Sequence, residues 1–246
     1  LTAVALGDTY ECHACGSSFE AGLVRVPRAW GAGGEEMAEA AFLPLPYPEV
    51  AVVDEETLEE QTLALAAALP DRPVVIGGCC CAHTGAVEGL AAQYERLAVV
   101  WLDAHGDLNT PETSPSGNAW GMPLRLLIDG GTVDPRDTAL VGARSLDPPE
   151  EEFIAASGMR VGPDAVEEAV AGAEAVYVAF DCDVLEPGQG VAVYMPEPGG
   201  LTVDEATQVL DRVRAGGPVA GVGFTGLTAA PRNAGELCRF TAALGL

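Results

Sequence analysis

Apolar runs typical of buried strands alternate with stretches of helical spacing along most of this chain. The runs predict strands at residues 2–6, 50–53, 73–76, 97–102, 138–141, 175–180 and 219–224. Between them, the spacing predicts helices at residues 57–69, 84–94, 149–157, 164–171, 203–214 and 233–244. Strands that alternate with helices form a mostly parallel sheet covered on both faces. The sequence therefore predicts a three-layer α/β/α fold, and its 246 residues suit a single domain over residues 1–246.

Side chains that bind metals follow two of these strands. Asp103, His105 and Asp107 come directly after residues 97–102, and Asp181 and Asp183 come after residues 175–180. Ligands of parallel sheets bind beyond the carboxyl ends of the strands, so these side chains are expected to lie together. Four carboxylates and one imidazole predict a site for two divalent cations, and such donors suit Mn²⁺. A solvated loop after each strand is the alternative, but it does not explain why the pattern occurs twice.

Cysteines occur in two notable clusters. Cys79, Cys80 and Cys81 follow the strand at residues 73–76, where a thiolate could complete the coordination shell of a metal. Free cysteines also serve as small buried apolar residues, so position alone leaves both roles open. Residues 12–15 form a C-x-x-C segment, which can bind zinc or act as a redox pair. Because no second pair is spaced for zinc, a structural zinc is not favoured there, and the position after the first strand predicts the same sheet edge as the metals.

Composition excludes several classes of function. A net charge of −25 and a pI near 4.1 argue against nucleic acid and acidic membrane surfaces as partners. All 12 basic side chains are Arg, so mechanisms that need a Schiff-base or phosphate-binding Lys are excluded. Seven cysteines, an odd number in a chain without a recognisable secretory leader, predict reduced thiols and a cytoplasmic location.

Three segments resemble the ureohydrolase family, which comprises arginase, agmatinase and formimidoylglutamase. Asp103-Ala-His-Gly-Asp-Leu-Asn-Thr-Pro is similar to the family's D-A-H-x-D-x-N-T segment. Phe180-Asp-Cys-Asp-Val-Leu-Glu-Pro is similar to its F-D-x-D-x-L-D-P segment, and Pro196-Glu-Pro-Gly-Gly-Leu-Thr to the P-x-P-G-G-L segment that follows. The resemblance runs from about residue 74 to about residue 210. It implies an arginase-like fold, a two-Mn²⁺ centre and a homo-oligomer, commonly a trimer or hexamer.

The resemblance also implies a role for each candidate ligand. Asp103 and Asp181 would bridge the two Mn²⁺ ions, Asp107 would bind one ion, and His105 and Asp183 the other. The remaining family ligand is a His in a G-G-D-H segment, and Cys80 stands at its place in this chain. The Nω-hydroxyarginine hydrolase branch of the family resembles this chain in having Cys there. A thiolate is softer than an imidazole and would shift preference toward other divalent metals such as Zn, Co or Fe.

Substrate-binding positions are retained, whereas two catalytic positions differ. The residues at the family's amino-acid-binding positions are Asn109, Ser116, Asn118 and Asp147. Trp120 replaces a proton-shuttling His, and Gly226 stands where the family has the carboxylate that pairs with the guanidinium. Glu112 could compensate for the missing carboxylate, but its loop is expected to face solvent.

Two functions are compatible with this pattern. The first is a dinuclear-metal hydrolase, with Asp107 as its catalytic residue, that cleaves a C–N bond of a guanidino- or amidine-like group on an α-amino acid and releases urea or an analogue. A hydroxyguanidine is one example of such a group, and a small amino-acid-like molecule is the expected partner. The alternative is a non-catalytic protein of the same fold that acts as a binding or regulatory subunit, which the changes at Trp120 and Gly226 favour.

Overall fold

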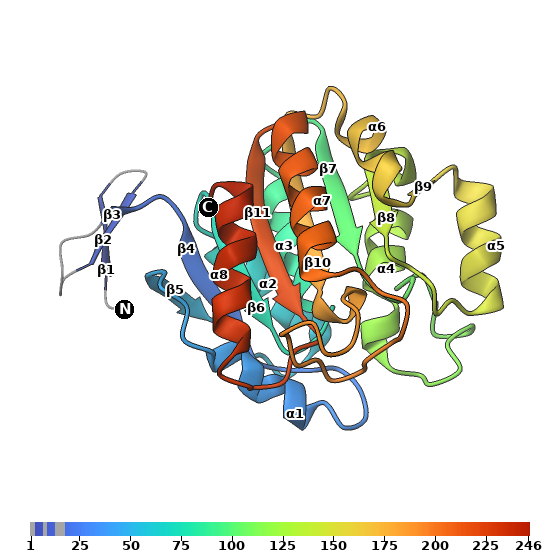
Figure 1. The fold of residues 1–246 in the computed structure, drawn as a ribbon, viewed down its shortest axis with the longest axis horizontal. Helices are drawn as coiled ribbons and strands as arrows, with labels where there is room; N and C mark the ends of the chain where they lie inside the picture. Colours follow the sequence, from blue (N-terminus) through green and yellow to red (C-terminus); the bar gives the residue numbers. More distant parts are fainter. Residues whose placement is uncertain (1–2, 7–8, 13–17) are drawn as a thin grey trace.

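The computed structural model describes residues 3–6, 9–12 and 18–246, and its centre is an eight-stranded sheet (Figure 1). The strands lie in the order β5-β4-β6-β11-β10-β7-β8-β9, and every neighbouring pair is parallel. They are β4 (Gly22–Val26), β5 (Glu49–Val52), β6 (Pro73–Gly77), β7 (Leu97–Leu102), β8 (Thr138–Val141), β9 (Arg160–Val161), β10 (Ala175–Asp181) and β11 (Val219–Thr225). The predicted mostly parallel sheet is confirmed.

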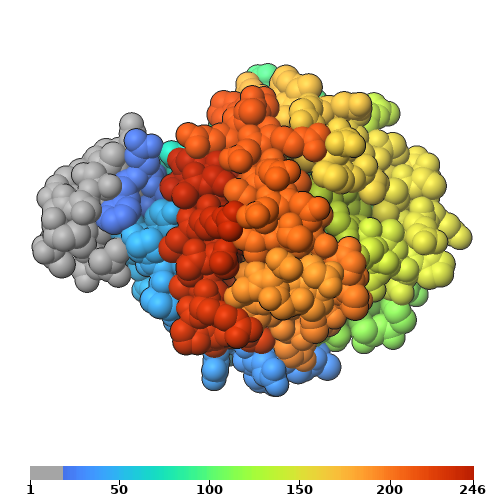
Figure 2. All heavy atoms as spheres, in the orientation of Figure 1, coloured from blue at the N-terminus to red at the C-terminus, as the bar shows by residue number. Residues whose placement is uncertain are grey.

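Helices cover both faces of this sheet and make two separate cores. One face packs against α2 (Leu58–Ala68), α3 (Ala82–Ala91) and α4 (Pro123–Asp129). The other packs against α6 (Val166–Val170), α7 (Val203–Gly216) and α8 (Asn233–Leu244), and Figure 2 shows α7 and α8 side by side over it. Successive strand residues alternate between the cores, as Val75 and Ile76 do, because side chains of a strand point to opposite faces. The predicted three-layer fold is therefore confirmed.

Shorter helices complete the described part of the chain. They are α1 (Glu35–Ala38), α5 (Pro148–Ser157) and the 3₁₀ helices Glu39–Phe42, Ala119–Gly121, Pro135–Asp137, Pro163–Ala165 and Cys182–Val184. Within the described ranges, no helix has both the length and the apolar character that crossing a membrane requires.

The first predicted strand does not join the main sheet, contrary to the prediction. It is β1 (Ala3–Leu6), which pairs antiparallel with β2 (Thr9–Cys12), and β2 pairs in turn with β3 (Ser18–Phe19). This small sheet lies to one side of the main sheet in Figure 1. Short connections join antiparallel neighbours, whereas a parallel partner needs a long crossover. The C-x-x-C segment was placed at the metal edge because of that strand; Cys12 ends β2, and residues 13–15 lie outside the described residues.

Other differences concern short elements. The strand β4 was not predicted, although all five of its residues are buried, because Arg25 interrupts its short apolar run. The helix α4 was also missed. The helix predicted at residues 164–171 starts as a 3₁₀ turn and is helical only over Val166–Val170, and the one predicted at residues 84–94 is Ala82–Ala91. Tertiary packing on the sheet, rather than local spacing, sets these boundaries.

Candidate metal centre and adjoining pocket

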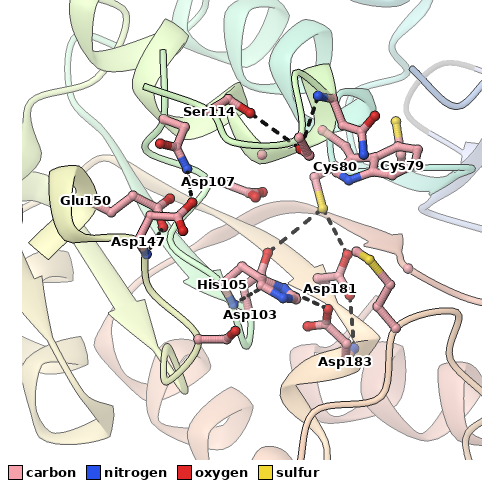
Figure 3. Close-up of a pocket in the computed structure, with 18 of the residues that line it drawn as sticks. Cys79, Cys80, Asp103, His105, Asp107, Ser114, Asp147, Glu150, Asp181 and Asp183 are labelled. Carbon is pink, nitrogen blue, oxygen red and sulfur yellow. Dashed lines mark hydrogen bonds and ion pairs between the residues drawn. The ribbon is translucent and has the colours of Figure 1, made fainter. Parts of the chain in front are cut away.

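The carboxyl ends of β6, β7 and β10 bring candidate metal ligands together (Figure 3). Cys80 follows β6, Asp103 follows β7, and Asp181 is the last residue of β10. The Cys80 Sγ atom lies 2.9 Å from Asp181 Oδ2 and 3.9 Å from Asp103 Oδ2. Residues far apart in the sequence meet here because parallel strands end at the same edge of the sheet.

The predicted ligands form two groups that share one carboxylate. In each group, the atoms able to bind a metal lie within 4.8 Å of one another; the groups are Cys80, Asp103 and Asp107, and Asp103, His105 and Asp183. Asp181 joins them, because its Oδ2 contacts Cys80 and its Oδ1 accepts the Asp183 N–H at 2.9 Å. A carboxylate shared between two ligand groups is the arrangement that two neighbouring cations require.

Backbone N–H groups hold these carboxylates in place. Asp103 Oδ1 accepts the His105 N–H at 2.7 Å, and Asp183 Oδ1 accepts the Ala104 N–H at 3.0 Å. Arg144 donates to the carbonyl oxygens of Asp183 (2.8 Å) and Glu197 (2.7 Å) and so anchors the loop after β10. One oxygen each of Asp103 and Asp183 is thereby fixed, which preorganises part of the ligand geometry.

Asp107 has two unusual features. Its φ is +54°, and among the described residues it is the only one other than glycine in the left-handed region, which indicates backbone strain held by the surroundings. Its Oδ2 atom is buried and has no hydrogen-bond partner. A buried anionic oxygen without a donor is costly, and a divalent cation would remove that cost. The donor set and this oxygen both fit divalent metal ions.

Burial and mutual repulsion shift the acidity of the ligands. Burial raises the pKa of the Cys80 thiol, and the neighbouring carboxylates raise it further. Burial lowers the pKa of His105, but the hydrogen bonds and charges of Asp103 and Asp183 outweigh it and bring that pKa to about 12. The imidazolium therefore balances two carboxylates, with its Nδ1 3.0 Å from Asp183 Oδ2. Metal binding at these groups must release protons.

The metal-free protein should lose stability as pH rises from about 4 to about 7. Burial and the charge of Asp183 raise the pKa of Asp181 to about 7, and burial and the charge of Asp103 raise that of Asp183 to about 6. In this window the folded state keeps protons that the unfolded chain has released, so the free energy of unfolding falls, by a few kcal/mol in all. Thermal unfolding with a chelator, at several pH values, measures this trend. With saturating Mn²⁺ the trend should reverse, because metals bind ionised ligands; identical trends with and without Mn²⁺ would contradict the metal assignment.

A cavity of about 290 Å³ opens over these ligands. All four predicted substrate-binding residues line it: Asn109, Ser116, Asn118 and Asp147. The Asn109 amide donates to Asp147 Oδ2 at 2.9 Å, and Ser116 Oγ accepts the Asn118 N–H at 3.2 Å. Asn118 Oδ1 is already engaged by the Ala32 N–H at 3.0 Å, so its amide nitrogen is the group left for a ligand. Glu112 is exposed, as expected, and does not line the cavity.

The two positions that differ from the family pattern lie in one apolar wall of the cavity. Trp120 packs edge-on against Tyr194, with ring centroids 6.4 Å apart, and the Tyr194 N–H donates to the Gly226 carbonyl at 2.8 Å. Gly226 has φ +68°, and a Cβ atom there would lie 2.0 Å from Asp181 Oδ1. Met37 and Met195 extend this wall. With the Asp181 carboxylate in this position, there is no room for a side chain at Gly226.

Sequence patterns missed several residues of the pocket. Glu150 is buried and ties two loops together, because its carboxylate accepts the Leu108 N–H and the Asp147 N–H, both at 2.9 Å. The capping-box spacing from Asp147 to Glu150 was a signal that could have identified it. No motif announces Met37 or Tyr194, since only the fold brings them to the cavity.

The fold and the site define a class of protein: a three-layer α/β protein with a carboxylate-rich candidate two-metal centre at the strand ends. The arginase family model matches residues 35–232, and the chain belongs to the arginase family. It is 38% identical to the arginase of Bacillus caldovelox over 160 residues, and this alignment covers 54% of each chain. It is 33% identical over 177 residues to the arginase of Bacillus subtilis (strain 168), which covers 62% of this chain and 60% of that protein. The aligned part of the chain thus spans somewhat more than half the length of these curated relatives.

A solved structure agrees in fold. The crystal structure of the Bacillus subtilis arginase superposes with a TM-score of 0.79 and 23% identity, covering 91% of this chain and 97% of that one. This likeness supports the arginase-like fold predicted from the sequence.

Proposed function

We propose that this protein is a dinuclear-metal hydrolase that cleaves a C–N bond of a guanidino- or amidine-like group on an α-amino acid. The observation that carries the proposal is the pair of ligand groups sharing Asp103 at the base of a cavity that also holds the Asn109–Asp147 pair. Membership of the arginase family supports the same chemistry. Two Mn²⁺ ions are the proposed cofactors, and a cytoplasmic homo-oligomer remains a prediction.

Each proposed ligand has a role that follows from its contacts. Two divalent cations would lower the pKa of water toward neutrality and so supply hydroxide for attack on the amidine carbon. Asp103 and Asp181 would lie between the cations, with Cys80 and Asp107 on one side and His105 and Asp183 on the other. Asp107, which belongs to a ligand group and lines the cavity, is the proposed catalytic residue and would accept a proton during the reaction.

The pocket indicates which substrates fit. Asn109 and Asp147 present an amide and a carboxylate, which suit the charged end of an α-amino acid. At the reacting end, the wall of Trp120, Tyr194 and Gly226 provides no carboxylate for a guanidinium. A buried cation without its partner is costly. We therefore propose a ureido derivative, which is neutral, or a hydroxyguanidino derivative, which is a weaker base than a guanidine, rather than arginine itself. A formimidoyl derivative, which has a smaller head group, is a further candidate.

Metal content and turnover measured on the same samples test this function. Plasma mass spectrometry should give two Mn per chain, and urea should be released from Nω-hydroxyarginine but not from arginine or agmatine. Two metals with no turnover of any of the three would direct the search to ureido and formimidoyl amino acids. Absence of metal after reconstitution with Mn²⁺ would contradict the hydrolase and favour the non-catalytic binding protein.

The variant Cys80→His should keep two metals, and its affinity for Mn²⁺ relative to Zn²⁺ and Co²⁺ should be higher than that of the wild type. Cys80 is buried against Asp181 and Asp103, and an imidazole there restores a harder, neutral donor. The Co²⁺-loaded wild type should show a thiolate-to-metal absorption band that the variant lacks. Cys238→Ser on α8, outside the pocket, is the matched control and should keep the band. An unchanged band in Cys80→His would remove Cys80 from the ligands.

A further inference from the structure

A chain of buried polar side chains lies behind the metal centre. Tyr177, His83 and Thr225 come from β10, α3 and β11, and all three are fully buried. His83 Nδ1 lies 3.1 Å from the Tyr177 hydroxyl, and His83 Nε2 lies 3.2 Å from Thr225 Oγ1. Thr225 Oγ1 in turn lies 3.0 Å from Asp181 Oδ2. The chain therefore ends on a proposed metal ligand.

The direction of every hydrogen bond in this chain follows from counting donors. When Asp181 is ionised as a metal ligand, Thr225 has one hydrogen and donates it to that carboxylate. The Thr225 oxygen must then accept from His83 Nε2. Burial lowers the pKa of His83 to about 3, so the ring is neutral and has a single N–H. Nδ1 is thus the acceptor for the Tyr177 hydroxyl, which fixes the tautomer.

Glycine at position 223 on β11 makes room for the hydrogen bond between Tyr177 and His83. A Cβ atom on Gly223 would lie 2.3 Å from the Tyr177 hydroxyl and 2.7 Å from His83 Nδ1, so the hydrogen bond between them needs glycine there. Trp101 packs edge-on against His83 with ring centroids 5.0 Å apart. Its indole N–H donates to Asp103 Oδ2 at 3.3 Å. Both carboxylates proposed to lie between the cations thus receive a hydrogen bond from the same buried cluster.

We propose that Tyr177, His83 and Thr225 form a relay of positioning residues that orients Asp181 toward the cations and strengthens metal binding. The proposal rests on the proposed two-metal function. A donor behind a metal-binding carboxylate fixes its orientation, and removing such a donor typically weakens metal affinity 10- to 100-fold. The Thr225 donor has a larger effect on metal binding when Cys80 is a ligand, because a bound thiolate adds a negative charge that an imidazole does not. The Thr225 hydrogen bond offsets part of the added charge at the neighbouring Asp181 carboxylate, and Thr225 Oγ1 lies 3.5 Å from Cys80 Sγ.

Calorimetric titration of metal-free protein with Mn²⁺ tests the relay. Thr225→Val keeps the shape of the side chain and removes the hydroxyl, so the dissociation constant should rise about 10- to 100-fold. Thr225→Ser restores the hydroxyl and should stay within about threefold of the wild type. Tyr177→Phe removes only the hydroxyl at the far end of the relay, so the Mn²⁺ dissociation constant should rise about 3- to 10-fold. In the double variant Thr225→Val with Tyr177→Phe, the second change should cost nothing more, because both act through one path.

Thr241→Val is the matched control, since Thr241 is equally buried on α8 but pairs with Tyr47 (2.6 Å) rather than with the site. It should lower thermal stability and leave the Mn²⁺ dissociation constant unchanged. The relay would be overturned if Thr225→Val bound Mn²⁺ as tightly as the wild type does. It would also be overturned if Tyr177→Phe raised the Mn²⁺ dissociation constant equally in the wild type and in Thr225→Val. Either result would leave the metal site intact. A wild type that binds no Mn²⁺ would overturn the metal site and the relay together.

Discussion

Asp103→Asn should abolish binding of both metals and reduce any hydrolysis by at least about 1,000-fold. Asp103 belongs to both ligand groups, so one substitution removes a charge from each proposed metal position. Removing one partner of a buried charge pair costs about 3–5 kcal/mol, which corresponds to about 10²- to 10⁴-fold in affinity. Plasma mass spectrometry after gel filtration measures the metal content, and urea release measures the activity.

The metal-free form of Asp103→Asn should fold normally. The amide oxygen can still accept the His105 N–H, and the variant removes a buried charge that Asp181 repels. Its thermal midpoint with a chelator should therefore equal or exceed that of the wild type. Asp71→Asn, at an exposed position outside the cavity, is the control and should bind two metals. Two metals retained in Asp103→Asn would contradict the proposed site.

Gly226→Ala should disrupt the metal centre although it adds a single carbon. A left-handed φ of +68° costs a non-glycine residue about 1–2 kcal/mol, and the new Cβ would lie 2.0 Å from Asp181 Oδ1. Either the end of β11 or the Asp181 side chain must move, and Asp181 then loses its position beside Cys80. We expect a loss of about 3 kcal/mol or more in stability and at least a 100-fold weaker Mn²⁺ affinity. Gly226→Glu should lose stability and Mn²⁺ affinity in the same way, and it should not gain activity toward arginine.

Gly131→Ala separates the backbone strain from the steric clash. Gly131 has a φ of +72°, lies outside the cavity, and a Cβ atom there meets nothing within 4 Å. It should lose only about 1–2 kcal/mol and keep the wild-type affinity for Mn²⁺. Denaturant unfolding and calorimetric titration of both variants provide the comparison. Equal behaviour of the two glycine variants would show that Gly226 does not press on Asp181.

Long elements and short motifs were predicted well from the sequence. β7 and β8 match their predicted bounds, because six consecutive apolar residues in β7 and the three that follow Thr138 in β8 leave little choice of boundary. The helix at residues 233–244 also matches, since its apolar face repeats over three turns. In contrast, β4 was missed, and the first strand was assigned to the wrong sheet, because strand partners depend on contacts far along the chain.

The candidate ligands were predictable because each stands directly after a strand, and the end of a parallel strand fixes where the next side chain goes. The contacts around these ligands could not be predicted from the sequence. The indole of Trp120 against Tyr194, and the hydrogen bonds from Tyr177 through His83 to Thr225, join residues separated by tens of positions.

The sequence by itself thus determined the layered fold and identified the candidate metal-binding side chains, since both follow from local periodicity and from residues within a few positions of one another. Only the tertiary structure decided that Gly226 lies against the Asp181 carboxylate, that Trp120 packs on Tyr194 in one wall of the cavity, and that hydrogen bonds connect Tyr177, His83 and Thr225 to Asp181. Close packing between distant segments sets those contacts, and periodicity carries no information about it.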